Sequence, residues 1–394
     1  MRDGIHDDAM NFDLPEELAM LKETVRRFVD RELIPIERET CEGGKIRPDL
    51  RAVLEEKAKA LGLWLYDVPE EYGGLGLGLL ARTVVWSELG RTIALPSRNA
   101  SIFGPSVSPI LYFLNEEQKE RYLRPVIAGE KKACFAQTEP DAGGDPGAMR
   151  STAVRDGDHY VINGMKRFIT GADEADFAQV FAATDREKGS RGGISGFLVD
   201  METPGVTLLR PQETMMDDRP WEIAFEDVRV PVENRIGEEG EGFRFAQNWI
   251  SAGRIRHGAR GMGVMERCLE LGARYAKERV TFGKPLAERQ AVQWMLVDTY
   301  ADLHQLRLIV RHAAWKADRG EDVRYEAYMC KYLGDTKSFE AADRCLQIHG
   351  GIGLTTDLPI ERMWRDQRSF VITEGPTEIL KMALARRVLR EYGG

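Results

Sequence analysis

The spacing of apolar residues changes twice along the chain, and this change limits the folds that the chain can adopt. In the first third, apolar residues recur at helical spacing from Leu18 to Leu33, between Pro15 and Pro35. Similar spacing predicts further amphipathic helices at residues 49–62, 78–95 and 116–128.

Helical spacing fades between Ala133 and Pro231. Short apolar or alternating runs replace it, separated by turn signals such as D-G at 156–157 and N-G at 163–164. These runs predict strands at residues 160–162, 168–170, 179–183, 196–199, 206–209 and 223–230. Several short strands at this spacing are typical of a small antiparallel barrel or sandwich.

Long helical patterns return from Gly242 and predict a four-helix bundle from residues 242–280, 286–318, 323–349 and 376–391. The predicted fold is therefore α+β and mainly α. We expect an N-terminal helical domain (1–132), a small antiparallel β-barrel domain (133–238) and a C-terminal bundle domain (239–394).

The composition excludes several classes of protein. A net charge of −9 makes nucleic acid an unsuitable main partner, because binding phosphate backbones needs a basic face. No segment has the apolar length needed to cross a bilayer, so no membrane insertion is predicted. The acidic first ten residues lack the features of a signal or transit peptide and predict a cytoplasmic protein. The five cysteines are scattered without a C-x-x-C pair, and no metal site is predicted.

Glu374 stands out because it lies on a Gly-Pro bend inside apolar sequence, F-V-I-T-E-G-P-T-E-I-L. Two readings are open. Glu374 could cap the helix that begins near Thr377. Alternatively, poor hydration raises the pKa of this carboxyl and makes Glu374 a general base.

Three other segments also allow two readings each. The turn-rich segment 134–145 is either a surface loop or a cradle of backbone N–H groups. Phe168 either belongs to the core or stacks on a flat cofactor, with the Thr170 hydroxyl two residues on. The basic residues at 254, 256 and 260 form either a solvated face or a phosphate contact.

The order of these motifs is more specific than any one of them. The chain reads T-E-P-D-A-G-G-D (138–145), F-I-T (168–170), R-V-T-F-G-K-P-L (279–286), Q-I-H-G-G-I-G (347–353), R-D (365–366) and I-T-E-G-P-T-E (372–378). This series resembles the acyl-CoA dehydrogenase superfamily from about Leu14 to Leu389. The G-R-I-R-H stretch at 253–257 looks closer to the modules of larger multidomain members than to the mitochondrial straight-chain enzymes.

The resemblance implies an FAD-dependent acyl-CoA dehydrogenase. Glu374 matches the base of the family motif I-Y-E-G-T and would remove the α-proton of the thioester, while the β-hydrogen leaves as hydride to flavin N5. The product would be a trans-2-enoyl-CoA, and an electron-transfer flavoprotein would accept the electrons. Some members carry the base one residue before an Arg that matches Arg254, but that position is Gly253 here.

The resemblance also assigns binding residues. Arg254 and Gly144 would contact the acyl-CoA. Some residues would contact the FAD of a neighbouring subunit, which implies a homotetramer built as a dimer of dimers. The implied cofactor-binding residues are Gln137, Thr138, Gly143, Gly144, Phe168, Thr170, Arg279, Thr281, Phe282, Gln290, Gln347, Gly350, Gly351, Thr377 and Glu378.

Gly144 and Pro376 depart from the family pattern, since each replaces a residue that carries a hydroxyl group. Ser101 stands where some relatives shape the acyl pocket, and Arg98 lies near the position of an Arg that recognises dicarboxyl-CoA substrates. Two other functions stay open: a flavin oxidase or monooxygenase on the same scaffold, and a non-catalytic FAD- or acyl-CoA-binding protein. Glu374 argues against both.

Overall fold

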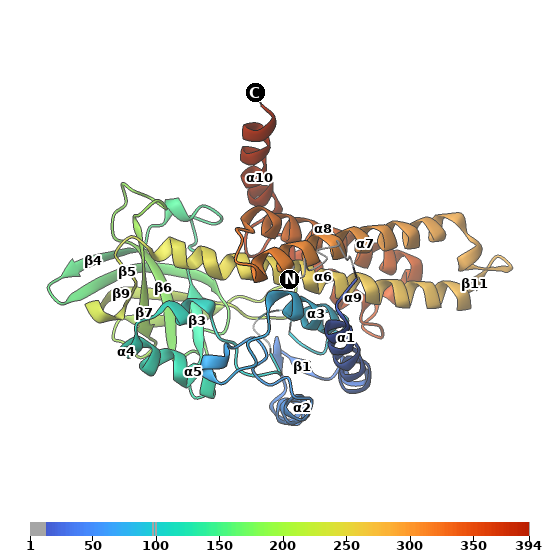
Figure 1. The fold of residues 1–394 in the computed structure, drawn as a ribbon, viewed down its shortest axis with the longest axis horizontal. Helices are drawn as coiled ribbons and strands as arrows, with labels where there is room; N and C mark the ends of the chain where they lie inside the picture. The colour runs from blue at the N-terminus through green and yellow to red at the C-terminus, as the bar shows by residue number, and fades with distance from the viewer. Residues whose placement is uncertain (1–12, 97, 99–100, 394) are drawn as a thin grey trace, which may run out of the picture.

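The computed structural model describes residues 13–96, 98 and 101–393, and its elements follow the predicted order of helices, strands and helices. In Figure 1 the strands lie on the left, the long helices extend to the right, and the N-terminal helices lie below them. The acidic first ten residues, from which the cytoplasmic location is predicted, lie outside the described residues.

The N-terminal helices form close to the predicted positions. Acidic residues in the first turn of α1 and basic residues in its last turn complement the helix dipole. The predicted helix at 78–95 ends earlier, at Leu89. The next residue, Gly90, packs closely against the chain at Arg260, since a Cβ at Gly90 would lie 2.4 Å from the carbonyl oxygen of Arg260. The elements are α1 (Glu16–Phe28), β1 (Cys41–Glu42), β2 (Lys45–Ile46), α2 (Pro48–Ala60), α3 (Leu79–Leu89), α4 (Glu116–Gln118) and α5 (Arg124–Ala128).

The middle region forms one eight-stranded sheet with the strand order β10-β7-β6-β4-β5-β9-β8, and β3 pairs with β6. Neighbouring strands are antiparallel except that β3 and β4 each pair in parallel with β6. The strands are β3 (Ala133–Ala136), β4 (Thr152–Asp156), β5 (His159–Ile169), β6 (Phe177–Ala183), β7 (Ile194–Asp200), β8 (Val206–Pro211), β9 (Trp221–Pro231) and β10 (Arg235–Ile236).

The tight turn predicted at Asn163-Gly164 is wrong, because β5 runs through both residues as one long strand. The register against β9 shifts between Ile162 and Gly164, as in a β-bulge. Gly164 has a φ of 148°, and a Cβ there would lie 2.3 Å from the Ser151 hydroxyl oxygen. This glycine therefore permits a close approach inside the sheet rather than a turn.

Long helices build the C-terminal part, and one of them was not predicted from the sequence. The missed helix is α9, where ion pairs one turn apart join Arg362 to Asp366 and Arg365 to Glu361. The helix α10 leaves the body of the molecule (Figure 1). The helices are α6 (Gly242–Glu278), α7 (Gln290–Asp318), α8 (Arg324–His349), α9 (Ile360–Phe370) and α10 (Thr377–Tyr392), and β11 (Val280–Thr281) and β12 (Lys284–Pro285) form a hairpin between α6 and α7.

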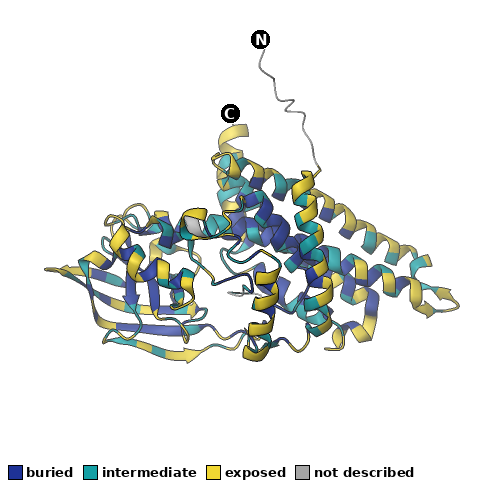
Figure 2. Ribbon diagram, turned by 60° about the horizontal axis from the view of Figure 1, so that its bottom comes forward, coloured by how far each residue is buried: buried dark blue, intermediate teal, exposed yellow. Residues whose placement is uncertain are grey.

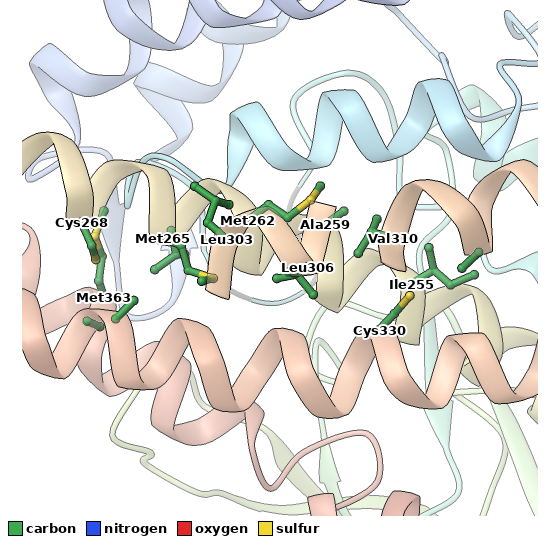
Figure 3. Close-up of a cluster of buried hydrophobic side chains, with 14 of the residues drawn as sticks. Ile255, Ala259, Met262, Met265, Cys268, Leu303, Leu306, Val310, Cys330 and Met363 are labelled. Carbon is green, nitrogen blue, oxygen red and sulfur yellow. The ribbon is translucent and has the colours of Figure 1, made fainter. Parts of the chain in front are cut away.

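Buried apolar side chains from α6, α7, α8 and α9 form the core of this region. Figure 3 shows side chains of α6 from Ile255 to Cys268 facing Leu306 of α7, Cys330 of α8 and Met363 of α9. Buried residues line the sheet and the helix contacts, and exposed residues cover the outer faces (Figure 2). In the described part of the chain, no helix combines the length and the apolar character needed to cross a membrane.

Candidate active site

Glu374 lies in the turn between α9 and α10, and its backbone is in the left-handed region. Its φ is +54°, and Gly375 follows with a φ of +100°. A non-glycine residue rarely adopts this conformation, and such residues concentrate at functional sites. Pro376 precedes the first residue of α10, and no side-chain hydrogen bond caps that helix. The reading of Glu374 as a helix cap is therefore wrong.

The carboxylate of Glu374 faces α6 and is only 20% exposed. Its Oε2 lies 3.2 Å from Nε2 of His257, without full hydrogen-bond alignment. Its Oε1 lies 4.0 Å from Nη2 of Arg256. A Cβ at Gly253 would lie 2.9 Å from Oε2, so the absence of a side chain there leaves room for this carboxylate. A base carried at 253 would thus occupy the space that Glu374 fills.

The charge around Glu374 changes the pKa predicted for its carboxyl group. Burial alone raises the pKa of this carboxyl, as the sequence predicts. His257, Arg256 and Lys331 outweigh burial and hold the pKa of Glu374 well below its usual value. The prediction of a raised pKa for the Glu374 carboxyl is therefore wrong for the protein without substrate. In this state Glu374 is an ionised carboxylate.

Arg254 lies on the other side of this turn and is 6% exposed. Its guanidinium carbon lies 4.7 Å from the centre of the Tyr328 ring, and its Nη2 would lie 3.4 Å from a Cβ at Gly375. Its Nε and Nη1 donate no hydrogen bond to any described residue. Burial lowers the pKa of this guanidinium. Arg254 thus has unused donors beside the turn that carries Glu374.

The basic residues of α6 do not form a fully solvated face, as one reading of the sequence allowed. Arg254 is buried, and Arg256 is partly buried beside Glu374. The guanidinium of Arg260 lies 5.5 Å from the centre of the Phe370 ring, and burial lowers its pKa to about 10. These cations gather at the turn that carries Glu374.

The segment after β3 approaches the same turn from the middle domain. A Cβ at Gly144 would lie 3.4 Å from Ile379 and 3.8 Å from Pro376. Gln137 has a buried Oε1 with no hydrogen-bond partner among the described residues. Thr138 is partly buried, and Gly143 is exposed with a φ of +53°. This segment therefore reaches the turn of Glu374 at Gly144 and carries a buried, unpartnered acceptor at Gln137.

Phe168 does not belong to the core, so that reading is wrong. It is 52% exposed and has a φ of +60°, at the end of β5. Thr170 follows the strand and is partly buried. An exposed aromatic ring in a strained conformation is consistent with a stacking surface.

The remaining predicted cofactor residues lie elsewhere on the chain. The β11–β12 hairpin lies at the far right in Figure 1, away from the sheet. The stacked rings of Tyr275 and His349, 4.4 Å apart, join the ends of α6 and α8 there. This end carries Arg279, Thr281, Phe282, Gln290, Gln347, Gly350 and Gly351. The start of α10 carries Thr377, which is buried, and Glu378, which is exposed.

Three residues near Glu374 were missed as site residues. His257 was noted only within the G-R-I-R-H stretch, and Asp335 and Lys331 on α8 were not noted at all. The spacing between Gly253 and His257 offered a signal, since residues four apart share a helix face.

The Arg98 side chain already has partners in the chain. Its Nε lies 3.7 Å from Asp218, and its Nη2 donates to the Ser369 hydroxyl at 3.3 Å. Ser101 is partly buried, and its hydroxyl accepts the N–H of Phe103 at 3.1 Å.

N-terminal helices, a sheet and a C-terminal set of long helices, with a carboxylate on a strained turn, together define the class of flavin-dependent acyl-CoA oxidoreductases. Family models match residues 15–130 (acyl-CoA dehydrogenase, N-terminal domain), 134–228 (middle domain) and 240–389 (C-terminal domain). The chain belongs to the acyl-CoA dehydrogenase family, whose members are FAD-dependent enzymes.

Three relatives illustrate the similarity. The chain is 37% identical over 394 residues to the mitochondrial short-chain specific acyl-CoA dehydrogenase of Homo sapiens, covering 98% of this chain and 94% of that protein. It is 36% identical over 384 residues to a subunit of the caffeyl-CoA reductase–Etf complex of Acetobacterium woodii, covering 95% of this chain and 99% of that protein. The structure of butyryl-CoA dehydrogenase from Megasphaera elsdenii is similar, with a TM-score of 0.85 and 32% identity. The match covers 97% of this chain and 100% of that protein's chain.

Proposed function

We propose that this enzyme removes the α-proton and β-hydride of an acyl-CoA thioester to form a trans-2-enoyl-CoA, with Glu374 as the base. The observation that carries the proposal is the ionised, four-fifths buried carboxylate of Glu374 on a strained turn. A thioester α-proton is weakly acidic, so its removal needs a base held in position with water excluded. Arg254, with two unused donors beside the turn, would contact the acyl-CoA.

The residues of the middle domain fit FAD. The buried, unpartnered Oε1 of Gln137 could accept a hydrogen bond from a flavin edge, and the exposed ring of Phe168 could lie against the flavin plane. Thr138 and Thr170 would add hydroxyl groups at the ring edge. Bound FAD supplies a hydride acceptor. Gly144 brings this segment to the turn of Glu374, where the thioester would lie between the base and the cofactor.

We also propose that a second copy of the chain completes the FAD site within a homotetramer. The predicted cofactor-binding residues on the β11–β12 hairpin, at the start of α7 and after α8 lie at the far end of the bundle from the sheet (Figure 1). Open space surrounds Gly350 and Gly351, where a Cβ would meet no atom within 4 Å. Several apolar side chains at this end are exposed: Val280 (57%), Phe282 (98%), Trp294 (58%), Val297 (61%) and Tyr300 (63%). An apolar surface of this kind is expected to be covered in the assembly.

An electron-transfer flavoprotein is the proposed electron acceptor, supported by the relative from an Etf complex. That relative is named a reductase, so the same residues could also serve the reverse reaction, in which Glu374 returns a proton to the α-carbon. The cytoplasmic location and the domain boundaries 1–132, 133–238 and 239–394 remain proposals from the sequence.

Anaerobic titration of the purified enzyme with acyl-CoAs of different chain lengths tests the proposal. We expect the flavin absorbance to bleach with the wild type, and the rate of bleaching to fall about 10²–10⁴-fold in Glu374→Gln with FAD retained. Glu130→Gln, which changes an exposed carboxylate in the loop after α5, is the matched control.

Other results would point to the alternatives. Near-normal bleaching in Glu374→Gln would refute the role of this base. Turnover only with oxygen would indicate an oxidase or monooxygenase, and bound FAD that no acyl-CoA bleaches would indicate a binding protein. Dicarboxyl-CoAs in the same panel, with Arg98→Ala, test the dicarboxylic substrate.

A further inference from the structure

His257 lies between two carboxylates inside the C-terminal part of the chain. Its Nε2 faces Oε2 of Glu374 at 3.2 Å, and its Nδ1 lies 3.0 Å from Oδ1 of Asp335. The His257 side chain is 4% exposed and that of Asp335 is 2% exposed. Each ring nitrogen of His257 therefore faces one carboxylate oxygen.

The chain of contacts continues behind His257 to α8 and α9. Nζ of Lys331 lies 2.7 Å from Oδ2 of Asp335 and donates to the carbonyl oxygen of Phe370 at 3.0 Å. The Phe370 ring packs edge-on against His257, with ring centroids 4.8 Å apart. Phe370 is the last residue of α9, four residues before Glu374. The network therefore ties the imidazole to α8 and to the segment that carries the base.

We propose that His257 is a positioning residue for the base: its ring, held in place by Asp335 and Lys331, orients the Glu374 carboxylate toward the substrate. This inference rests on the proposed function, because it takes Glu374 to be the base. A buried carboxylate without such a partner favours the protonated form, which cannot remove a proton.

The charges around the two groups support this assignment. His257 is the largest of the influences that lower the pKa of Glu374 against the effect of burial. From α9, the ring of Phe370 packs against His257. The charged groups that act on Glu374 or His257 are Arg254, Arg256 and Arg260 from α6 and Lys331 and Asp335 from α8, and Asp366 from α9 acts on Arg260.

The test compares the pH dependence of turnover in wild type, His257→Gln and a matched control. Glutamine keeps a hydrogen-bond donor but removes the ring. Because His257 lowers the pKa of Glu374, its removal should move the acid limb of kcat to higher pH by about one unit or more. At neutral pH, where Glu374 stays ionised, kcat should still fall about tenfold or more because the carboxylate loses its orientation, while KM changes less. His159→Gln is the control, since His159 also faces a carboxylate, Asp158 at 2.6 Å, but on the surface.

A second readout does not depend on turnover. Infrared difference spectra of the holoenzyme without substrate follow the carboxyl band that Glu374→Gln removes. We expect this band to appear at a higher pH in His257→Gln than in the wild type. If His257→Gln loses FAD or unfolds, Asp335→Asn replaces it, because it removes the anchor of the ring and should shift the band in the same direction.

The outcomes separate the two proposals. If Glu374→Gln keeps near-normal activity, the proposed function fails. If Glu374→Gln is inactive but His257→Gln and Asp335→Asn keep the wild-type acid limb and infrared band, the inference about His257 alone is overturned. A lower melting temperature with an unchanged acid limb would likewise assign His257 a structural role only, against the proposal.

Discussion

Lys166 and Glu139 form a buried ion pair that holds the segment with the proposed flavin contacts. Their side chains are 0% and 3% exposed, and Nζ of Lys166 lies 2.7 Å from Oε1 of Glu139. Nζ also donates to the carbonyl oxygen of Gln137 at 3.2 Å. The Glu139 carboxylate accepts the backbone N–H groups of Arg150 at 2.6 Å and Ser151 at 2.9 Å. Changing Lys166 to Met keeps the bulk of the side chain and removes the charge.

The expected effect is large because one buried charge is left without its partner. Burial raises the pKa of Glu139, but Lys166 outweighs it and the net shift is downward. Breaking a buried pair costs about 3–5 kcal/mol, and the two remaining amide bonds to Glu139 favour the lower end, about 3 kcal/mol. In the double variant Lys166→Met/Glu139→Gln, no charge is left alone. Its loss of stability should be smaller than the sum of the single losses by about 1–3 kcal/mol.

The pH dependence gives a further check. Burial lowers the pKa of Lys166 to about 8 from 10.5, even with Glu139 beside it. Between these values the unfolded chain binds one more proton than the folded chain, so stability from this group rises with pH. The stability difference between wild type and Lys166→Met should therefore grow above pH 8 by about 1.4 kcal/mol per unit.

Urea unfolding of the holoenzyme at pH 7 and pH 9, followed by tryptophan fluorescence, measures these differences, and flavin absorbance reports FAD retention. Lys166→Met should also lose FAD, because Gln137 and Thr138 lie on the segment that Lys166 holds. Two results would contradict the reasoning. One is a loss of stability in the double variant that equals the sum of the two single losses. The other is a stability difference between wild type and Lys166→Met that does not change with pH.

Two further substitutions test the geometry of the site and the proposed assembly. Gly253→Ala would place a Cβ 2.9 Å from the Glu374 carboxylate; the flexible side-chain end can move, so the melting temperature should hold while kcat falls about tenfold or more in steady-state assays. Wild-type kcat would show that the carboxylate does not need this space. Phe282→Ser should weaken the tetramer and FAD retention in sedimentation and absorbance measurements, because this ring is 98% exposed in the single chain. An unchanged tetramer with full FAD would refute the proposed contact.

The order of the three parts was predictable because periodicity reports which face of an element is buried. The runs near residues 242–280 and 323–349 became α6 and α8 with small changes at their ends. The N-G turn failed because the dipeptide signal is local, whereas Gly164 is set by its contact with Ser151 across the sheet. The helix α9 was missed because only a few apolar residues, such as Ile360 and Met363, face the core.

The position of Glu374 on a bend was predictable, but its electrostatic setting was not. The Gly-Pro bend and the motif order mark Glu374 in the sequence. The cations that lower its pKa come from α6 and α8, which lie roughly 40 to 120 residues away along the chain. A segment read alone shows only the apolar neighbours of Glu374, and these predict a shift of the pKa in the opposite direction.

The depressed pKa of Glu374 has a direct consequence for the proposed reaction. A carboxylate stabilised by nearby cations is ready to act over a wide pH range but is a weaker base. Substrate binding changes this balance, because a thioester packed against the partly exposed carboxylate removes its remaining water. Loss of water raises the pKa of a carboxyl, while the cations on α6 and α8 keep the group ionised until the proton is taken. The basicity of Glu374 would therefore rise only when substrate fills the site, whereas the carboxylate stays charged in the enzyme without substrate.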